Sequence, residues 1–270
     1  MPSVKRQLGY GGSASIASTQ VLITGGSFEQ ASAISYLSMI STPPDVTPAG
    51  RVQHADGVNS YTGSLAFDVH EEAMSIFSPG GGLLQRFYEF DIGINSGGID
   101  ASGIAYDWKM SKCKLTSLTL AGAVGGLVTA NLSYLALSGR AIGSTSNNFI
   151  RDSVTPLGYW YTGTGSSDDV KDWNLTMNQE AELVYKNSDS VEPAYIKVGA
   201  VSYVLTVTSF KDLFPAGDTQ QIVIATDTFT LKGKSTSRGF SFGGVTDVGT
   251  YSYTFETSSQ TGASDAVVIT

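Results

Sequence analysis

The chain has 270 residues, of which 41% are hydrophobic and 15% are charged, and its formal net charge is −8. This composition excludes a disordered chain, and no apolar run is long enough for a transmembrane helix. The acids (24 Asp and Glu against 16 Lys and Arg) argue against a protein that grips nucleic acid, because such binding needs clustered cations on phosphates. The single cysteine, Cys113, excludes a disulfide framework and a multi-thiolate metal site.

Short runs that alternate apolar and polar residues predict an all-β fold. Strands are expected at Gln20–Thr24, Asn59–Val69, Leu127–Ala136, Val170–Met177, Val201–Ser209 and Thr250–Thr257. The residues expected to face the core are Tyr61, Leu65, Phe67, Val69, Val128, Ala130, Leu132, Tyr134, Ala136, Trp173, Leu175, Met177, Val201, Tyr203, Leu205, Val207, Tyr251, Tyr253 and Phe255. Val204 is an exception to the alternation, because it is an apolar residue at an outward position.

Two short helices, each of about two turns, are predicted where the alternation stops. The first ends at Phe77 and the second at Phe214, and a Pro and a Gly follow each of them. In the second helix, Ser209 and Asp212 resemble a capping box, and Pro215 ends the helix. Phe77 and Phe214 are expected to pack each helix on its sheet.

The two halves of the sequence share one order of predicted elements: strand, arm, strand, helix and several strands. This shared order favours two copies of one fold. The expected organisation is an N-terminal segment 1–14, a first copy 15–138 with a long arm 25–56, a linker 139–167, a second copy 168–258 and a C-terminal tail 259–270. Tyr159, Trp160 and Tyr161 of the linker are too apolar to stay in solvent and are expected to dock on a surface.

The outward positions of the predicted strands are polar and carry no cation. They are Ser60, Thr62, Ser64, Asp68, Thr129, Asn131, Ser133, Asp172, Asn174, Thr176, Ser202, Thr206, Thr208, Ser252, Thr254 and Glu256. A wall past which DNA slides needs this chemistry, because each cation would add a phosphate contact while hydroxyls stay hydrated. The alternative is an ordinary solvent face of a β-sandwich, although such faces normally mix both signs of charge.

Catalytic and metal motifs are incomplete. The HEEAM run at His70 lacks the second histidine of a zinc helix. Ser241 lies in a Gly-x-Ser-x-Gly match, but a β-type sequence follows it and both histidines precede it, which argues against a nucleophile elbow. The acids at 168–169 lie in a Gly/Ser-rich segment, and the basic cluster at 232–238 is expected on a solvated or subunit-facing turn. We therefore expect no enzyme, no metal and no cofactor.

The chain resembles the tail tube (major tail) proteins of long-tailed bacteriophages, in the tandem form with two tube folds in one chain. The resemblance lies in the strand-then-helix units Leu65–Phe77 and Leu205–Phe214, the entry VKDWNLTMNQEAEL at Val170–Leu183, the passage EPAYIKVGAVSYVLTV at Glu192–Val207 and the hairpin SLTLAGAVGGLVTANLSYLALSGR at Ser117–Arg140. It covers most of the chain. The arm 25–56 and the linker are longer than the usual pattern.

The resemblance implies an all-β fold of two tandem tail-tube-like β-sandwich/barrel copies, each with one short helix. Inner sheets would join edge to edge with those of neighbouring copies around a lumen, three chains would form a pseudo-sixfold ring, and rings would stack into a conduit for genome ejection. The polar residues given above would face the lumen. The arm residues expected to contact the next ring are Ser41, Thr42, Pro43, Pro44, Asp45 and Val46.

The implied partners are further copies of the chain, the tape measure protein, the tail terminator and distal tail proteins, and DNA that passes without specific binding. A virion location after assembly in the host cytoplasm is expected, with no membrane partner. A second hypothesis is a carbohydrate-binding or adhesive β-sandwich subunit of a fibre, with Trp108, Tyr159, Trp160 and Tyr161 as a stacking platform. A hydrolase that uses Ser241 or the acids at 168–169 is a third, but the sequence offers neither a plausible set of partners.

Overall fold

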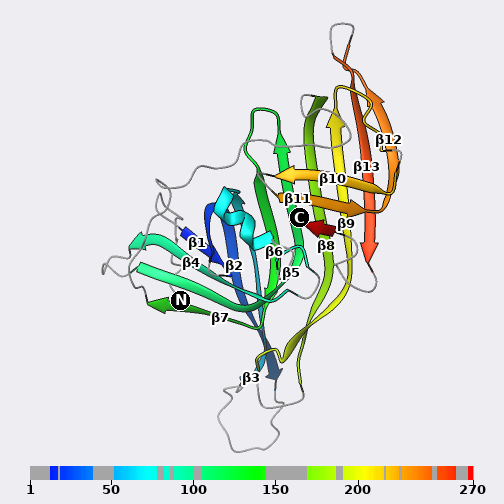
Figure 1. Cartoon of the computed structure of the whole chain (residues 1–270). Helices are drawn as coiled ribbons and strands as arrows, with labels where there is room; N and C mark the ends of the chain where they lie inside the picture. Colours follow the sequence, from blue (N-terminus) through cyan, green and yellow to red (C-terminus); the bar gives the residue numbers. More distant parts are fainter. Residues whose placement is uncertain are drawn as a thin grey trace, which may run out of the picture.

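Figure 1 shows the protein as a computed structural model that is built almost entirely of β-strands. The structure describes residues 13–17, 19–38, 52–77, 82–85, 88–99, 105–143, 169–186, 191–215, 217–224, 227–244, 248–259 and 267–269. The strands are β1 (Ser13–Ile16), β2 (Thr19–Ser38), β3 (Val52–Asp68), β4 (Phe90–Ile99), β5 (Ala105–Ala123), β6 (Thr129–Ala136), β7 (Ser138–Gly143), β8 (Val170–Val184), β9 (Tyr195–Ser209), β10 (Thr219–Ile224), β11 (Asp227–Lys232), β12 (Lys234–Ser241), β13 (Thr250–Ser259) and β14 (Val267–Ile269). The one helix in these ranges is the 3-10 helix η1 (Glu71–Phe77), so the predicted all-β class is confirmed. No helix in the same ranges has the length and apolar character needed to cross a membrane.

An eleven-stranded antiparallel sheet holds most of the strands, and β10, β11 and β14 form a separate three-stranded sheet. Within the large sheet, the strands β2, β3, β6, β5, β8, β9, β13 and β12 are hydrogen-bonded side by side in this order, and we call them the main sheet. β1 and β4 connect β2 back to the first part of β5, which also pairs with β7. The main sheet therefore runs through both halves of the sequence without a break.

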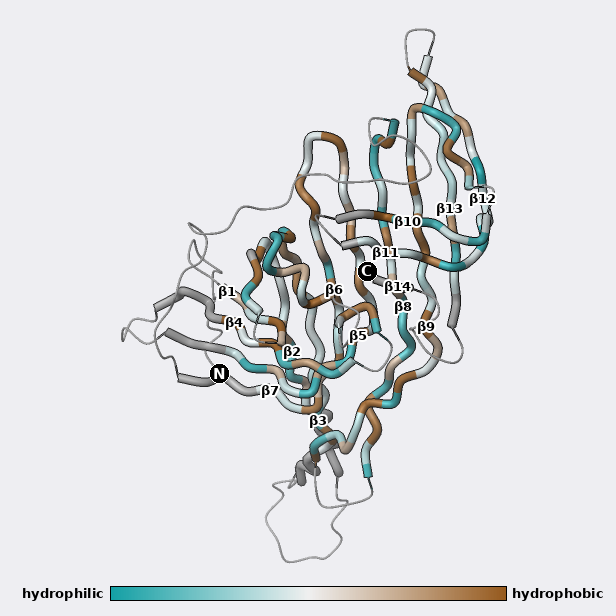
Figure 2. The backbone as a smooth tube through the Cα atoms, in the orientation of Figure 1, coloured by the Kyte–Doolittle hydropathy of each residue, from teal (hydrophilic) through white to brown (hydrophobic). Residues whose placement is uncertain are grey.

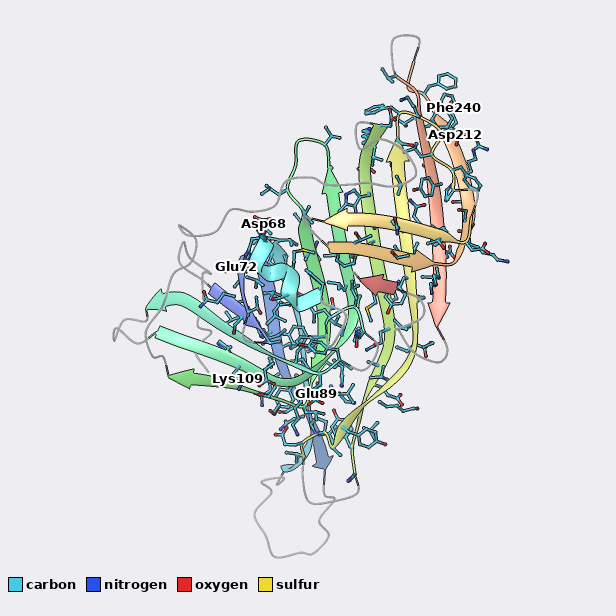
Figure 3. The ribbon with its side chains drawn as sticks, in the orientation of Figure 1. Asp68, Glu72, Glu89, Lys109, Asp212 and Phe240 are labelled. Atoms are coloured by element: carbon cyan, nitrogen blue, oxygen red, sulfur yellow. The ribbon has the colours of Figure 1, made fainter. Side chains whose placement is uncertain are left out.

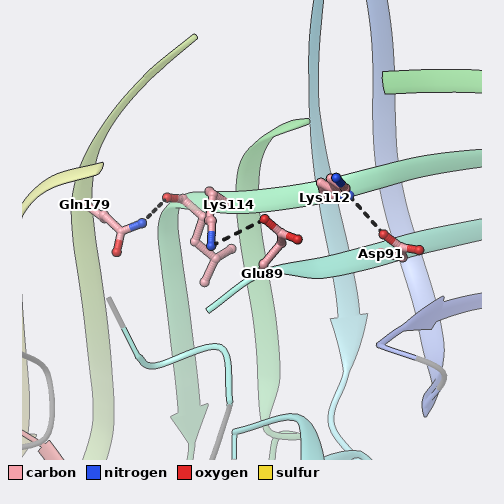
Figure 4. Close-up of polar contacts among 6 residues, drawn as sticks. Glu89, Asp91, Lys112, Lys114 and Gln179 are labelled. Atoms are coloured by element: carbon pink, nitrogen blue, oxygen red, sulfur yellow. Dashed lines mark hydrogen bonds and ion pairs between the residues drawn. The ribbon is translucent and has the colours of Figure 1, made fainter. Parts of the chain in front are cut away.

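Strand β5 belongs to two groups of strands because it bends in its middle. Its residues up to Cys113 pair with β4, and its residues from Lys114 pair with β6. At the bend, Lys112 has a φ of 53°, which is uncommon outside glycine, and its backbone N–H donates a 2.9 Å hydrogen bond to Oδ1 of Asp91 (Figure 4). Burial alone would raise the pKa of Asp91, but the Lys112 N–H and the Lys109 ammonium, 3.1 Å away, lower this pKa further than burial raises it. The charged carboxylate of Asp91 thus supports the bend.

Side chains of the main sheet alternate between two faces, and one of these faces forms the core. Figure 2 shows hydrophobic residues recurring along the strands and along η1. One row of opposed core residues contains Phe67, Ala130, Leu120, Leu175, Leu205 and Phe255, and the next contains Leu65, Leu132, Leu118, Met177 and Tyr203. The predicted inward residues are all buried except Tyr251, which is half-buried with its ring centroid 4.7 Å from that of Phe240.

Different elements cover the core face in the two halves of the main sheet. The covering side chains include Ala73, Met74, Ile76 and Phe77 of η1 and Ile222, Phe229 and Leu231 of β10 and β11. In Figure 1, β10 and β11 cross over β8 and β9. These side chains belong to one hydrophobic cluster, and the Tyr203 hydroxyl links the two halves by donating a 2.6 Å hydrogen bond to the Leu84 carbonyl.

The first predicted short helix is present as η1, but the second, at Ser209–Phe214, is wrong. Residues 210–215 form bends and irregular chain without a helix. The Ser209 hydroxyl does not cap a helix, because it donates a 2.6 Å hydrogen bond to the Lys211 carbonyl. Phe214 is 38% exposed, whereas Phe77 of η1 is 1% exposed. A two-turn helix makes few hydrogen bonds for the residues that it orders, so local side-chain bonds compete well when no buried face supports it.

Strands extend into three segments that the sequence predicted as connections. β7 begins next to the expected linker 139–167 and occupies its first residues, and β14 lies within the expected tail 259–270. β2 and β3 pair along the expected arm 25–56, up to the pair Ser38 and Val52. The fold therefore uses these segments partly as sheet.

The contact between Gly122 of β5 and Trp173 of β8 gives a stability prediction. A Cβ atom on Gly122 would lie 2.8 Å from Nε1 of Trp173, whose side chain is 1% exposed and has no room to move. We expect Gly122→Ala to lower the free energy of unfolding by about 1–3 kcal/mol, measured by denaturant unfolding. Gly217→Ala is the control, because nothing lies within 4 Å of its Cβ position. Equal stability of the two variants would contradict this packing.

Candidate functional site

The second face of the main sheet is polar in both halves. The register places hydroxyl, amide and carboxylate residues opposite one another on successive strands, in neighbouring rows. The first row contains Ser27, Ser64, Ser133, Ser117, Asn178 and Ser202; the second contains Gly25, Ala66, Asn131, Thr119, Thr176, Val204, Glu256 and Lys234; the third contains Asp68, Thr129, Ala121, Asn174, Thr206, Thr254 and Ser237; the last contains Ala123, Asp172, Thr208, Ser252 and Gly239. We call these rows the polar face.

The structure brings the polar residues predicted at outward positions to one side of the main sheet. All of them belong to the polar face except Ser60 and Thr62, which continue the same side of β3, with Thr62 opposite Glu29. The sequence analysis missed Ser27, Ser117, Thr119 and Asn178. The alternation that predicted Thr176 and its neighbours continues to Asn178, so this residue could have been found; the place of Ser27 depends on its pairing with β3.

Hydrogen bonds between side chains run along the polar face. The hydroxyls of Ser27 and Ser64 lie 2.8 Å apart, and those of Thr119 and Thr176 lie 3.4 Å apart across the β5–β8 pair. Thr176 also donates to Oδ1 of Asn174 at 2.9 Å. Cross-strand polar pairs of this kind each contribute roughly 0.2–1 kcal/mol, and they leave the remaining lone pairs to water.

Charges are sparse on the polar face, and nearly all of them are negative. Asp68, Asp172 and Glu256 are its carboxylates. Its one cation is Lys234, which lies on the terminal strand β12 opposite Glu256 of β13. Between β2 and β13 the rows contain neither Lys nor Arg. A surface of this kind binds water well and binds phosphate poorly.

Lys114 of β5 is a cation just beyond these rows, and the exposed Lys171, at the bulge of β8 next to Asp172, is another. Lys114 is opposite Leu135, its side chain is 14% exposed, and its Nζ lies 3.8 Å from a carboxylate oxygen of Glu89 (Figure 4). Burial lowers the pKa of Lys114 below its ordinary value, although Glu89 acts in the opposite direction. The same figure shows the buried Gln179 of β8, whose amide donates a 2.8 Å hydrogen bond to the Leu115 carbonyl. Lys114 therefore offers little free charge to a passing anion.

The outer strand β12 carries an exposed aromatic residue on the side opposite the polar face. Phe240 is 55% exposed and lies at the same end of the molecule as Asp212 (Figure 3). Next to it, Arg238 forms an ion pair with Asp212, and its guanidinium lies 5.3 Å from the centre of the Phe214 ring. An aromatic side chain at a sheet edge has nothing to cover it from that side unless another chain does so.

The remaining candidates give no second site in the described part of the chain. The predicted contact residues Ser41, Thr42, Pro43, Pro44, Asp45, Val46, Tyr159, Trp160 and Tyr161 lie outside the described residues. Trp108 is half-buried in β5, and Ser241 ends β12, with no helix in the residues 242–244 that follow it. His70 is 2% exposed, with Nε2 3.0 Å from the Gln20 carbonyl oxygen. No group of three or more His, Cys, Asp or Glu in the described ranges is placed to hold a metal ion.

The sequence matches no protein-family model and no curated protein. The function is therefore inferred from the chemistry and placement of the polar face. Hydroxyls and amides dominate this face, with three carboxylates among them. Such an arrangement suits hydration and weak contact.

Two neighbouring residues of β9 test whether the polar face is unpacked in the isolated chain. Leu205 is 0% exposed on the core face, so Leu205→Ala is expected to cost about 2–5 kcal/mol of unfolding free energy. Thr206 is exposed on the polar face, so Thr206→Ala should change stability by no more than about 0.5 kcal/mol. Denaturant unfolding of both variants at low protein concentration measures the difference. Comparable losses would mean that the polar face packs against another part of the same chain.

Proposed function

We propose that this chain is the tail tube protein of a long-tailed bacteriophage, a structural virion protein whose copies form stacked rings around a channel for the genome. The observation that carries the proposal is the polar face, which crosses both halves of one sheet with no cation between β2 and β13. DNA moves freely past a wall only if the wall holds water and does not hold phosphate. Each lysine or arginine contact would add affinity for the backbone and slow the passage.

The strand order supports two tandem copies of one fold. In the main sheet, the group β2-β3-β6-β5 is followed by the group β8-β9-β13-β12. The strands that are similar in sequence, β3 with β9 and β6 with β13, take the same place in each group. The covers differ, since η1, β1 and β4 cover the first group while β10, β11 and β14 cover the second. The repeat is therefore proposed for the main sheet and not for its cover.

In the proposed assembly, three chains form a pseudo-sixfold ring, and the arm around Ser41–Val46 contacts the next ring. The partners are further copies of the chain, the tape measure protein inside the tube, and the tail terminator and distal tail proteins at its ends. DNA passes through the lumen without specific binding. The role is structural, so it needs no cofactor and no catalytic group, and the protein is placed in the virion after assembly in the host cytoplasm.

Self-assembly tests the proposal directly. Purified protein is expected to shift from monomer to rings and tubes as its concentration rises, measured by sedimentation velocity and negative-stain microscopy. A cryo-microscopy map of the tubes should place Ser64, Thr129, Asn174 and Thr254 on the wall of a central channel. Protein that stays monomeric at high concentration, or assemblies with these residues turned away from a channel, would contradict it. Binding on a glycan array without assembly would favour the fibre-subunit alternative.

A further inference from the structure

The main sheet ends in two strands with open edges. β12 pairs with β13 on one side, and no strand in the described part of the chain pairs with its other side. At the opposite end, β1 pairs with β2 only at Thr19–Val21, so in the described ranges the rest of that edge of β2 has no partner. Open edges present unpaired N–H and C=O groups to any strand that fits them. Edges of this length need either protection or a partner.

The junction between β5 and β8 shows how this chain pairs two such edges. There Ser117–Ala123 lies antiparallel to Asp172–Asn178, with Leu118 opposite Met177. β5 is the outer strand of its group beside β6, as β12 is beside β13. β8 is the first strand of its group beside β9, as β2 is beside β3. The junction of β12 with β2 of another copy would therefore repeat a pairing that already exists inside the chain.

One matched pair of residues sets the correspondence between the two groups. We match Leu65 of β3 with Leu205 of β9, because each lies among the last five residues of its strand and both are buried. The residues opposite them are Gly26 and Leu132 for Leu65, and Leu175 and Phe255 for Leu205. One strand further, Leu132 is opposite Leu118, and Phe255 is opposite Ser235. Once Leu65 is matched with Leu205, the pairings extend the correspondence to both outer strands.

We propose that β12 of one chain pairs with β2 of the next in the register of the β5–β8 junction, which sets Lys234 opposite Glu29 and Ser237 opposite Ser27. This inference rests on the proposed function, because it describes the contact between copies in the ring. In the correspondence, Lys234 replaces Ser117 and Glu29 replaces Asn178, which are opposite one another inside the chain. Ser117 and Asn178 are neutral, whereas Lys234 and Glu29 carry opposite charges.

The chemistry of Lys234 and Glu29 fits this pairing. Both are exposed, and neither has an ion-pair partner among the described residues. Directly opposed residues of antiparallel strands have Cβ atoms about 4.5–5.5 Å apart, which lets an ammonium meet a carboxylate. Lys234, the one cation of the polar face, would then lie between Glu29 of the next chain and Glu256 of its own strand pair. Its charge would be neutralised where DNA passes.

On the side opposite the polar face, each of the two junctions pairs an aromatic residue with a smaller one. Inside the chain, Gly122 faces the large indole of Trp173. In the same places at the junction between chains, Phe240 faces the smaller Ile23. The aromatic residue comes from β8 inside the chain and from β12 between chains, so each pair contains one aromatic ring and one smaller residue. The pairing would also cover Phe240, which is 55% exposed in the single chain.

Disulfide cross-linking tests the register. In the double variant Ser27→Cys with Ser237→Cys, the two cysteines would be directly opposed between chains, at a separation that a disulfide spans. Mild oxidation of assembled protein is expected to give a ladder of linked chains on a denaturing gel. The matched control, Glu29→Cys with Ser237→Cys, moves one cysteine by two residues on the same side of β2, and it should give little ladder. Cys113 is buried and stays outside the reaction.

The outcomes separate the register from the function. Channelled tubes with the ladder only in the Ser27 and Ser237 pair support the inference. Tubes with no ladder, or with a stronger ladder in the shifted control pair, overturn the register and leave the proposed function standing. A ladder without any channel supports the junction and contradicts the tube. Absence of any assembly overturns both.

Charge reversal gives an independent test of the Lys234 and Glu29 contact. Glu29→Lys and Lys234→Glu each place like charges opposite one another, so each is expected to raise the critical concentration for assembly by roughly tenfold or more at low salt. The double reversal should recover much of this loss, and added salt should reduce the effect of the single changes. Glu72→Lys on η1 is the control, because Glu72 is exposed and lies outside both edges. Single changes that behave like this control would overturn the contact.

Discussion

The backbone pairing of β5 with β8 is the constraint on which the rest of the structure depends. It joins two groups of strands into one sheet, and it holds Gly122 against Trp173 at the joint. The bend at Lys112 makes this possible, because β5 gives its first part to β4 and β7 and its second part to the main sheet. A slip of one residue at the joint would move every core residue of one half to the polar face. The register therefore preserves both faces over the whole sheet.

The polar face is distinguished by its lack of cations as well as by its hydroxyl groups. The chain has 16 Lys and Arg, yet the rows between β2 and β13 contain none of them. Serine and threonine in these rows satisfy one another across strands, as Ser27 and Ser64 do at 2.8 Å. Serine has a low strand propensity, and on this face its side chain adds no core contacts, so each serine costs some stability. Under the proposed function this cost has a reason, because the face would meet a moving polyanion that it must not hold.

Local patterns predicted the strands of the main sheet but not their arrangement. The alternation at Val201–Ser209 gave the buried residues correctly and also identified Val204 as an exception on the polar face. The bend of β5 depends on the bond between Asp91 and Lys112, which are far apart in the sequence, so no local pattern contains it. The prediction of the second helix was wrong, because its short sequence pattern resembled that of the first helix but had no buried face to support it. The sequence could show which positions are polar; only the pairing shows that they share one surface.

If the chain assembles as proposed, the two kinds of junction must not be confused with each other. A β5 edge could meet β2 of another chain in place of β8, and a ring built that way would be misassembled. The residues differ enough to discriminate, since Ser117 offers no charge to Glu29 while Lys234 does. Trp173 of β8 likewise fits against Gly122 of β5. If β8 paired with β12 instead, Trp173 would collide with Phe240. Specificity of this kind needs both a favourable contact in the right pairing and an unfavourable one in the wrong pairing. The two junctions offer the means for both, because a neutral pair at one (Ser117 and Asn178) corresponds to a charged pair at the other (Lys234 and Glu29), and the aromatic residue lies on opposite strands in the two.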